Sequence, residues 1–328
     1  MTPPVKPRVL VALRPTGVEP PSLLKKAGDL ADFVFAVTAD DIGEEAATID
    51  SAFVWNFRST LVPDAIDRLP RLRWVHVAAS GVDASLSDEV RARGITFTNS
   101  RGVTAPAMAE YALMLMLAHA KDLTGTLADQ AEKAWRPRES RMLSGATLVA
   151  IGVGPVNREL ARRATALGMT VIGVGRRARD GVDGFDRVVG RDRLLDVLPL
   201  ADHVVIATPL TAETRGLIGA AELAALPDGA HLVNLGRGAV VDEAALMAAL
   251  RSGRLGGAGL DVLWREPLEP EHDLWETPGV IVSPHTSSDF VGWEDAMVDL
   301  FVRNLRHTLR GEPLLNVVDL DLGYAPID

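Results

Sequence analysis

The sequence predicts an α/β protein with two doubly wound parallel sheets. Short apolar runs rich in β-branched residues alternate with longer helical patterns along most of the 328 residues. Such alternation is typical of buried parallel strands that helices cover on both faces. The pattern changes near residue 104 and resumes at residue 147 with a strand that ends in glycines. The chain is too long for one small core, so we predict two domains.

The first series of elements precedes residue 100. Its predicted strands are residues 9–13, 33–37, 52–55 and 74–78, and its predicted helices are residues 20–31 and 63–69. A helix from Thr104 to about Leu123 follows, with an early proline and an apolar surface almost all round. A helix of that composition is expected to be buried.

The second series begins after a polar run at residues 122–144. Its predicted strands are residues 147–152, 170–175, 187–189, 203–208, 231–235, 257–261 and 280–283. A final helix spans about residues 293–310 and ends at Gly311. Six or seven strands of which the first ends in glycines form the doubly wound, dinucleotide-binding Rossmann pattern.

The glycine turn is Gly152-Val153-Gly154-Pro155-Val156-Asn157. Its first two glycines let the chain reverse and let the backbone approach a pyrophosphate, which binds at the following helix N-terminus. Asn157 stands where a third glycine normally allows the helix to pack close to the strand. Asn157 therefore either props the helix away or donates to a phosphate, and a turn without a ligand is the alternative interpretation.

The end of the second Rossmann strand favours NADP(H) over NAD(H). An NAD site usually has an acidic residue there to accept hydrogen bonds from the ribose. This chain has Arg176, Arg177 and Arg179, with no acid before Asp180. Guanidinium groups match the oxygens of a 2′-phosphate. A solvated basic turn is the other interpretation, although the chain as a whole is acidic.

Three polar residues follow predicted strand ends on the ligand-binding side of the second sheet: Arg237, Glu266 and His285. An arginine grips a carboxylate with two hydrogen bonds, and a histidine exchanges a proton near neutral pH. A carboxylate orients such a histidine and stabilises its charged form. Each residue alone also has an ordinary structural interpretation, but the set predicts acid–base chemistry on a carboxylate substrate.

The segment NLGRGAVVDEAALMAALRSGRLGGAGLDVLWREPL, followed by LWETPGVIVSPH, resembles the D-isomer-specific 2-hydroxyacid dehydrogenase family. RGVTAPAMAEYALMLMLA and ADHVVIATPLTAETRGLIG occur in that family's order, so the resemblance covers essentially the whole chain. It implies a flavodoxin-like substrate domain, residues 1–100 plus 289–328, and a Rossmann domain, residues 101–288. The arginines at 176 and 177, together with Trp55, resemble its glyoxylate and hydroxypyruvate reductase branch.

The resemblance also implies roles for individual residues. Arg237 would hold the substrate carboxylate and carbonyl, His285 would exchange the proton, and Glu266 would pair with His285. The implied substrate contacts are Trp55, Ser80, Gly81 and Val82. The implied cofactor contacts are Met108, Gly152, Gly154, Pro155, Val156, Asn157, Arg176, Arg177, Thr208, Pro209, Leu210, Asp261 and Ser287. The expected reaction is reduction of a small 2-oxo acid to the D-2-hydroxy acid by NADPH, in a homodimer.

Composition argues against other classes of protein. A formal charge of −10 and a pI near 5.2 disfavour nucleic-acid and anionic-membrane partners. The chain has no cysteine, and its histidines lack metal-ligand spacing, so we expect no metal. No targeting segment is evident, which favours the cytoplasm. The alternative is a dinucleotide-sensing regulatory protein that resembles the family's corepressor branch. A Rossmann-like scaffold that binds no ligand is the third possibility.

Overall fold

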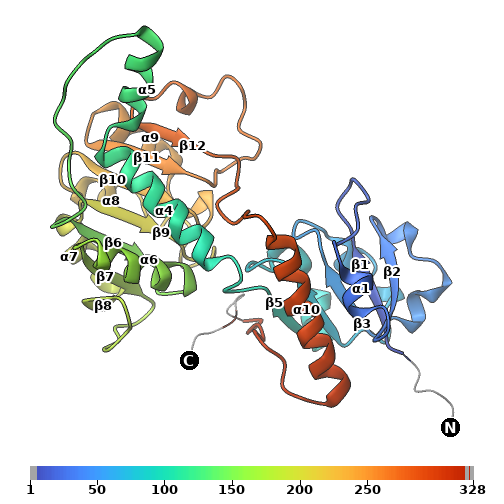
Figure 1. The fold of residues 1–328 in the computed structure, drawn as a ribbon. Coiled ribbons are helices and arrows are strands. Elements are labelled where there is room, and N and C mark those ends of the chain that lie inside the picture. The colour runs from blue at the N-terminus through green and yellow to red at the C-terminus, as the bar shows by residue number, and fades with distance from the viewer. Residues whose placement is uncertain (1–5, 322–324, 326–328) are drawn as a thin grey trace. The chain divides into compact units, whose positions relative to one another are not determined.

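The computed structural model describes residues 6–321 and 325. The chain divides into two compact units, Met1–Val103 with Phe290–Asp328, and Thr104–Asp289 (Figure 1). Each unit is built on one sheet in which all the strand pairs are parallel. The predicted fold class is therefore confirmed.

The first unit contains a five-stranded sheet, here called sheet A, in the order β2-β1-β3-β4-β5. Its strands are β1 (Arg8–Ala12), β2 (Asp32–Ala36), β3 (Ser51–Val54), β4 (Trp74–Val77) and β5 (Thr96–Asn99). This is the order of the flavodoxin-like fold, in which the chain first moves to one side of β1 and then to the other. The switch point lies between β1 and β3.

Apolar side chains from both faces of sheet A are buried under helices. On one face, Val9, Phe53 and Trp74 pack with Phe301 of α10 (Trp293–Arg310) and with residues of α1 (Leu23–Ala27). The other face packs against a second cluster, which includes residues of α2 (Leu61–Asp64) and α3 (Asp88–Ala92). The helix predicted at residues 20–31 is shorter than expected, and the one predicted at residues 63–69 overlaps α2 only at residues 63–64. Helix α10 begins and ends as predicted.

Strand β5 was not predicted, because its sequence TFTN is polar. The structure shows that Thr98 is nevertheless fully buried, with its hydroxyl 2.8 Å from both Trp74 Nε1 and His76 Nδ1. Buried polar groups need hydrogen-bond partners, and the Thr98 hydroxyl is the partner of both the Trp74 and the His76 side chains on the neighbouring strand. The polarity of β5 is thus matched to β4 and does not indicate a loop.

The second unit contains a seven-stranded sheet, here called sheet B, in the order β12-β11-β10-β9-β6-β7-β8. Its strands are β6 (Thr147–Ile151), β7 (Thr170–Gly175), β8 (Arg187–Gly190), β9 (His203–Ile206), β10 (Ala230–Asn234), β11 (Leu255–Leu260) and β12 (Val280–Val282). This is the Rossmann order with one further strand, and its switch point lies between β6 and β9.

Helices cover both faces of sheet B. They are α4 (Ala105–Ala120), α6 (Pro155–Ala166), α7 (Leu194–Val197), α8 (Ala220–Ala225) and α9 (Glu243–Arg251), whereas α5 (Leu123–Glu132) follows α4 and contacts that helix. Helix α4 packs on α6 and reaches the sheet at β10 and β11. A side chain at Gly259 of β11 would meet Leu115 of α4 at about 3 Å, so this glycine lets the helix lie close to the sheet.

The long apolar helix is buried on one side only. Residues such as Ala109, Ala112 and Met116 face the core, whereas Met114 and Leu117 are exposed in the single chain. The helix ends at Ala120, and Asp122, in a left-handed conformation, caps α5 by accepting from the Gly125 N–H. Helix α5 lies within the predicted polar run and was not expected. No helix among the described segments has the length and apolarity to span a bilayer.

Candidate active site

The predicted site residues of the second unit lie just beyond the carboxyl ends of its parallel strands. Gly152 follows β6, Arg176 follows β7, and Thr208 lies two residues after β9. Arg237, Asp261 and His285 similarly follow β10, β11 and β12. Carboxyl ends of parallel strands meet at one edge of a sheet, where open α/β folds bind ligands.

The two glycines of the turn have different structural roles. Gly152 has a φ of 95°, which favours glycine, and a side chain there would meet the Ala207 carbonyl oxygen at 2.7 Å. Gly154 is extended and caps α6, and a side chain built on it meets no atom of the described chain within 4 Å. Gly152 is therefore required by the fold, whereas Gly154 leaves open space in front of the helix N-terminus.

Asn157 acts as a brace inside the turn. Its side-chain amide donates to the carbonyl oxygens of Ile151 and Gly152 at 3.0 and 2.8 Å, and the residue is completely buried. These two bonds use the amide group within the turn, which supports the interpretation that Asn157 fills the space between helix and strand. A contact between Asn157 and the cofactor stays a prediction.

The basic turn after β7 is open to solvent. Arg176 and Arg177 are both exposed. Across residues 6–321 and 325, neither guanidinium has a hydrogen bond or ion pair with another side chain or with the backbone. Two uncommitted cations next to a glycine-rich strand end are available for an anionic ligand. The structure thus offers the donors that the sequence predicted, while their role stays a prediction.

The turn that carries Arg237 is held by contacts on both sides. The Asn234 side chain bonds to the Arg237 carbonyl and the Gly236 N–H, both at 3.0 Å. A side chain at Gly236 would lie 2.8 Å from the Thr208 carbonyl oxygen, and one at Gly238 would collide with the Leu263 backbone. Both glycines therefore allow backbone segments to touch. The Arg237 side chain donates from Nη1 to the Gly236 carbonyl at 2.9 Å.

Glu266 and His285 form a hydrogen-bonded pair. Glu266 Oε2 lies 2.9 Å from His285 Nδ1, and Oε1 accepts from the Leu263 N–H at 3.1 Å. Both side chains are about one-quarter exposed. With Nδ1 bonded to the carboxylate, Nε2 is the ring nitrogen that can exchange a proton with a ligand. The structure therefore brings these two predicted residues together.

Asp261 fixes the loop on which His285 lies. Its Oδ1 accepts from the Ser283 hydroxyl at 2.6 Å and the Thr286 N–H at 2.9 Å, and its Oδ2 accepts from the Ser287 N–H at 3.0 Å. The carboxylate is only 1% exposed. Sequence reasoning placed Asp261 beside a nicotinamide, and that role stays a prediction. It missed the positioning function, because the bonding partners lie more than twenty residues away.

The other predicted cofactor residues occupy the same edge of sheet B or the adjacent helix. Thr208, Pro209 and Leu210 form the loop after β9, which Thr214 closes by donating to the Pro209 carbonyl at 2.7 Å. Met108 is in the second turn of α4 and packs against the cluster that contains Leu235. Pro155 and Val156 are the first two residues of α6. Ser287 contributes its backbone N–H to Asp261.

The predicted substrate residues belong to the first unit. Trp55 directly follows β3, and Ser80, Gly81 and Val82 lie in the loop after β4. Asn99 braces this loop by donating to the Ser80 carbonyl at 2.6 Å. Trp55 and Val82 are buried, and Ser80 is exposed. The four residues thus lie at the carboxyl edge of sheet A, and their contacts with a substrate stay a prediction.

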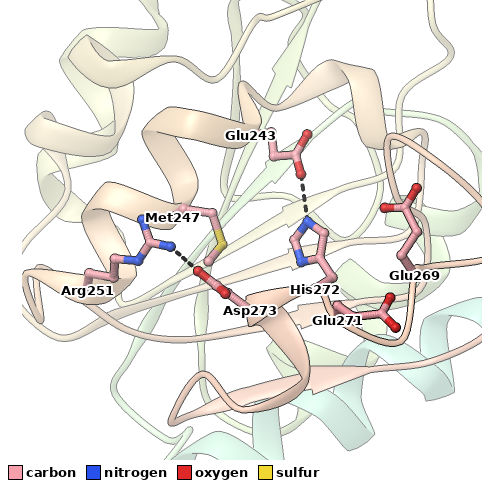
Figure 2. A pocket seen from close by; sticks show the side chains of 7 residues that line it. All are labelled: Glu243, Met247, Arg251, Glu269, Glu271, His272 and Asp273. Carbon is pink, nitrogen blue, oxygen red and sulfur yellow. Dashed lines mark hydrogen bonds and ion pairs between the residues drawn. The ribbon is translucent and has the colours of Figure 1, made fainter.

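A second histidine–carboxylate pair lies along α9, in a cavity of about 460 Å³ (Figure 2). His272 Nε2 is 2.9 Å from Glu243 Oε1, and Arg251 pairs with Asp273. Glu269 and Glu271 also line this cavity. The cavity thus contains four carboxylates and one arginine, and its negative charge would repel an anionic substrate. This pair is therefore a poorer candidate for the catalytic pair than Glu266 and His285.

Three further histidines gather at the opposite, amino edge of sheet B. His119 stacks on His231 with ring centroids 4.3 Å apart, and His203 approaches His231. Burial lowers the pKa of His203 to about 4 and that of His231 well below its usual value. These rings stay neutral near pH 7, which suits packing and disfavours proton exchange. Over the described residues, no group of three or more histidines and acids could hold a metal ion.

Residues 113–287 match the family model described as D-isomer-specific 2-hydroxyacid dehydrogenase, NAD-binding domain. A glyoxylate reductase of Thermococcus kodakarensis is 35% identical over 260 residues, which cover 76% of this chain and 77% of the relative. A glycerate dehydrogenase of Methylorubrum extorquens is 32% identical over 269 residues, or 78% of this chain and 82% of the relative.

Solved structures resemble the whole chain. An NADPH-dependent glyoxylate/hydroxypyruvate reductase of Sinorhizobium meliloti, in complex with NADP and sulfate, has a TM-score of 0.85 and 28% identity. The match covers 97% of this chain and 100% of the solved chain. A D-isomer-specific 2-hydroxyacid dehydrogenase of Xanthobacter autotrophicus, in complex with NADPH and MES, has a TM-score of 0.82 and 30% identity. It covers 98% of this chain and 100% of its own.

The two glycines of the turn predict opposite effects of substitution by alanine. Gly154→Ala should leave the unfolding temperature unchanged or slightly raised, because its side chain has room, and should weaken dinucleotide binding about tenfold or more. Gly152→Ala should destabilise the fold by about 1–3 kcal/mol through its positive φ and the Ala207 contact. Thermal unfolding and fluorescence titration with NADPH measure both effects. Unchanged binding by Gly154→Ala would place the phosphates elsewhere.

Proposed function

Because the chain belongs to the D-isomer-specific 2-hydroxyacid dehydrogenase family, we propose that it reduces a small 2-oxo acid to the D-2-hydroxy acid. We propose NADPH as the preferred hydride donor and a substrate of the glyoxylate or hydroxypyruvate kind. The observation that carries the proposal is the 2.9 Å Glu266–His285 pair, beside an arginine turn at the same sheet edge. The relatives named as glyoxylate reductases support the substrate class.

The residues of this edge suit a bound dinucleotide. The turn at Gly152 and Gly154 leaves space before the N-terminus of α6, where phosphate binding is favoured. When bound, the nicotinamide supplies the hydride that reduces carbon 2 of the substrate. Arg176 and Arg177 would hold the 2′-phosphate, and the loop Thr208–Leu210 would line the adenosine side. Met108 and Asp261 would lie on the nicotinamide side.

The protein's own groups would carry out the rest of the reaction. Protonated His285 donates from Nε2 to the carbonyl oxygen as negative charge develops there, and Glu266 stabilises the imidazolium through Nδ1. Arg237 binds the substrate carboxylate and polarises the carbonyl. In the first unit, the backbone N–H groups of Ser80, Gly81 and Val82 would bind a substrate carboxylate, and Trp55 would line the substrate pocket.

We also propose that the protein works as a homodimer in the cytoplasm. Exposed apolar side chains lie on α4 (Met114 and Leu117) and on α5 (Leu123 and Leu127). Trp135, in the segment after α5, is 95% exposed. Monomers rarely expose so many large apolar groups on consecutive elements, and a second copy would cover them.

Replacing His285 separates catalysis from binding. His285→Ala should lower kcat about 10²–10⁴-fold, because the proton donor is lost, and should leave the dissociation constant for NADPH unchanged. His272→Ala is the matched control, since it removes the histidine of the pair in Figure 2 and should keep full turnover. Steady-state kinetics with glyoxylate and fluorescence titration give both values. Weaker NADPH binding with unchanged turnover contradicts the assignment.

The same panel distinguishes the regulatory alternative. A dinucleotide-sensing protein would bind NADPH but fail to oxidise it with glyoxylate, hydroxypyruvate, pyruvate or any other small 2-oxo acid. The proposed enzyme oxidises it with at least one of them.

The cofactor preference depends on the arginine pair. The double variant Arg176→Ala, Arg177→Ala should raise the KM for NADPH by about 10–100-fold, because charge-assisted hydrogen bonds to the 2′-phosphate are lost, and should change that for NADH less than about twofold. Arg193→Ala is the control, since Arg193 already pairs with Asp196. Equal effects on the two cofactors would contradict the NADP preference.

The proposed dimer predicts a mass of twice the monomer in light scattering. Leu117→Glu combined with Leu127→Glu should yield monomers, because two charges would have to be buried in the interface. Leu195→Glu, at an exposed leucine of α7, is the control and should leave the mass unchanged. A monomeric wild-type protein would contradict the proposal.

A further inference from the structure

A cation, two indole rings and a carboxylate gather at the switch point of sheet A. Arg14 lies two residues beyond the end of β1, and Trp55 lies one residue beyond the end of β3. The N–H groups of Trp55 and Asn56 both donate to the Ala12 carbonyl, at 3.1 and 3.0 Å, so the two strand ends are tied together. Open α/β sheets bind ligands at such a point.

The Arg14 guanidinium is held on two sides. Its central carbon lies 4.9 Å from the Trp55 ring centroid and 5.2 Å from that of Trp293, the first residue of α10. The two indoles stack with centroids 5.9 Å apart and an interplanar angle of 12°. Arg14 Nη1 is 3.0 Å from Glu294 Oε1. Cation–π contacts and one ion pair together restrict the direction of the guanidinium.

The fixed guanidinium keeps hydrogen-bond donors free. Arginine carries five N–H groups. In the described part of the chain, only Nη1 of Arg14 has a side-chain acceptor, while the side chain is 35% exposed. The Trp55 Nε1–H is buried and lacks an acceptor among the same residues. Glu294, itself 35% exposed, adds an acceptor beside these donors.

This corner lies two strands away from the proposed substrate loop. Strand β3 pairs with β1 on one side and with β4 on the other, with Ala12 opposite Val54 and Val54 opposite Val77. Arg14, Trp55 and the loop with Ser80 therefore follow three adjacent strands, β1, β3 and β4, at the same edge of the sheet. Neighbouring strands are about 4.8 Å apart, so β1 and β4 lie about 10 Å apart. A molecule of three or four carbons with a hydrogen bond of about 2.9 Å at each end bridges that distance.

We propose that Arg14 and Glu294 form the subsite for a hydroxyl group on carbon 3 of the 2-oxo acid. The inference rests on the proposed function and deepens it, because it selects hydroxypyruvate-like acids over acids without a polar carbon 3. Arg14 donates a hydrogen bond to the hydroxyl oxygen, and Glu294 accepts a hydrogen bond from the hydroxyl group. Since the carboxylate neutralises the guanidinium, a second carboxylate on the substrate would be repelled by Glu294. Arg14 is thus a specificity-determining residue.

The test compares substrates that differ at carbon 3. At saturating NADPH, kcat/KM is measured for glyoxylate, pyruvate, hydroxypyruvate and oxaloacetate. Arg14→Met should lower the value for hydroxypyruvate about tenfold or more and change that for glyoxylate less than about twofold. Arg71→Met is the matched control, since Arg71 pairs with Asp50 before β3, at the other edge of sheet A, and should change neither value.

A variant of Glu294 tests the role of its carboxylate. Glu294→Gln should raise kcat/KM for oxaloacetate several-fold relative to that for hydroxypyruvate, because the repulsion of a second carboxylate is removed. If Arg14→Met does not fold, Arg14→Lys, which keeps the charge and loses the planar fork, should lower the hydroxypyruvate-to-glyoxylate ratio severalfold.

The outcomes separate this inference from the function on which it rests. The subsite alone is overturned if the wild-type protein reduces glyoxylate and the Arg14 variants keep the wild-type ratio of kcat/KM for hydroxypyruvate to that for glyoxylate. An equal loss of kcat/KM on all substrates in these variants also overturns the subsite alone. An unchanged oxaloacetate value in Glu294→Gln overturns the role of Glu294. No turnover of any 2-oxo acid by the wild-type protein overturns the proposed function and the subsite together.

Discussion

The buried carboxylate of Asp261 is the constraint on which the candidate site depends. A charge that is 1% exposed is tolerated only when its oxygens are hydrogen-bonded, and all three donors come from the loop after β12. Moving that loop would leave the charge unsatisfied. His285, whose backbone has a φ of 58°, is held between those donors in a conformation that few side chains adopt unaided. Glu266 then orients the ring from the other side.

Parallel topology explains why residues distant in the sequence can share this arrangement. Each strand of sheet B delivers its following loop to the same edge, and glycines let the loops touch. Gly152 lies against Ala207, Gly236 against Thr208, and Gly238 against Leu263. The polar groups are therefore positioned by backbone contact between loops, which is stiffer than contact between flexible side chains.

Much of this could be predicted from the sequence, because strand periodicity and short motifs are local signals. The seven strands of sheet B and the Glu266–His285 pair were expected. Strand β5 was not, because its threonines serve a neighbouring strand that local periodicity cannot reveal. Asn157 looked like a candidate ligand for phosphate, and only the geometry shows that its amide is used within the turn. The Arg14 corner joins residues 14, 55 and 293, and no window of sequence contains all three.

The collision that any side chain at Gly238 would have with the Leu263 backbone also bears on protein engineering. The arginine turn, the loop with Thr208, the loop with Glu266 and the loop with His285 fit against one another, so the smallest transplantable piece of this machinery runs from Thr208 to Ser287. Chimeras with a junction inside that stretch would separate loops that were shaped against each other. Residues around the switch point of sheet A lie outside that stretch of the chain, and they are the natural place for directed evolution to begin.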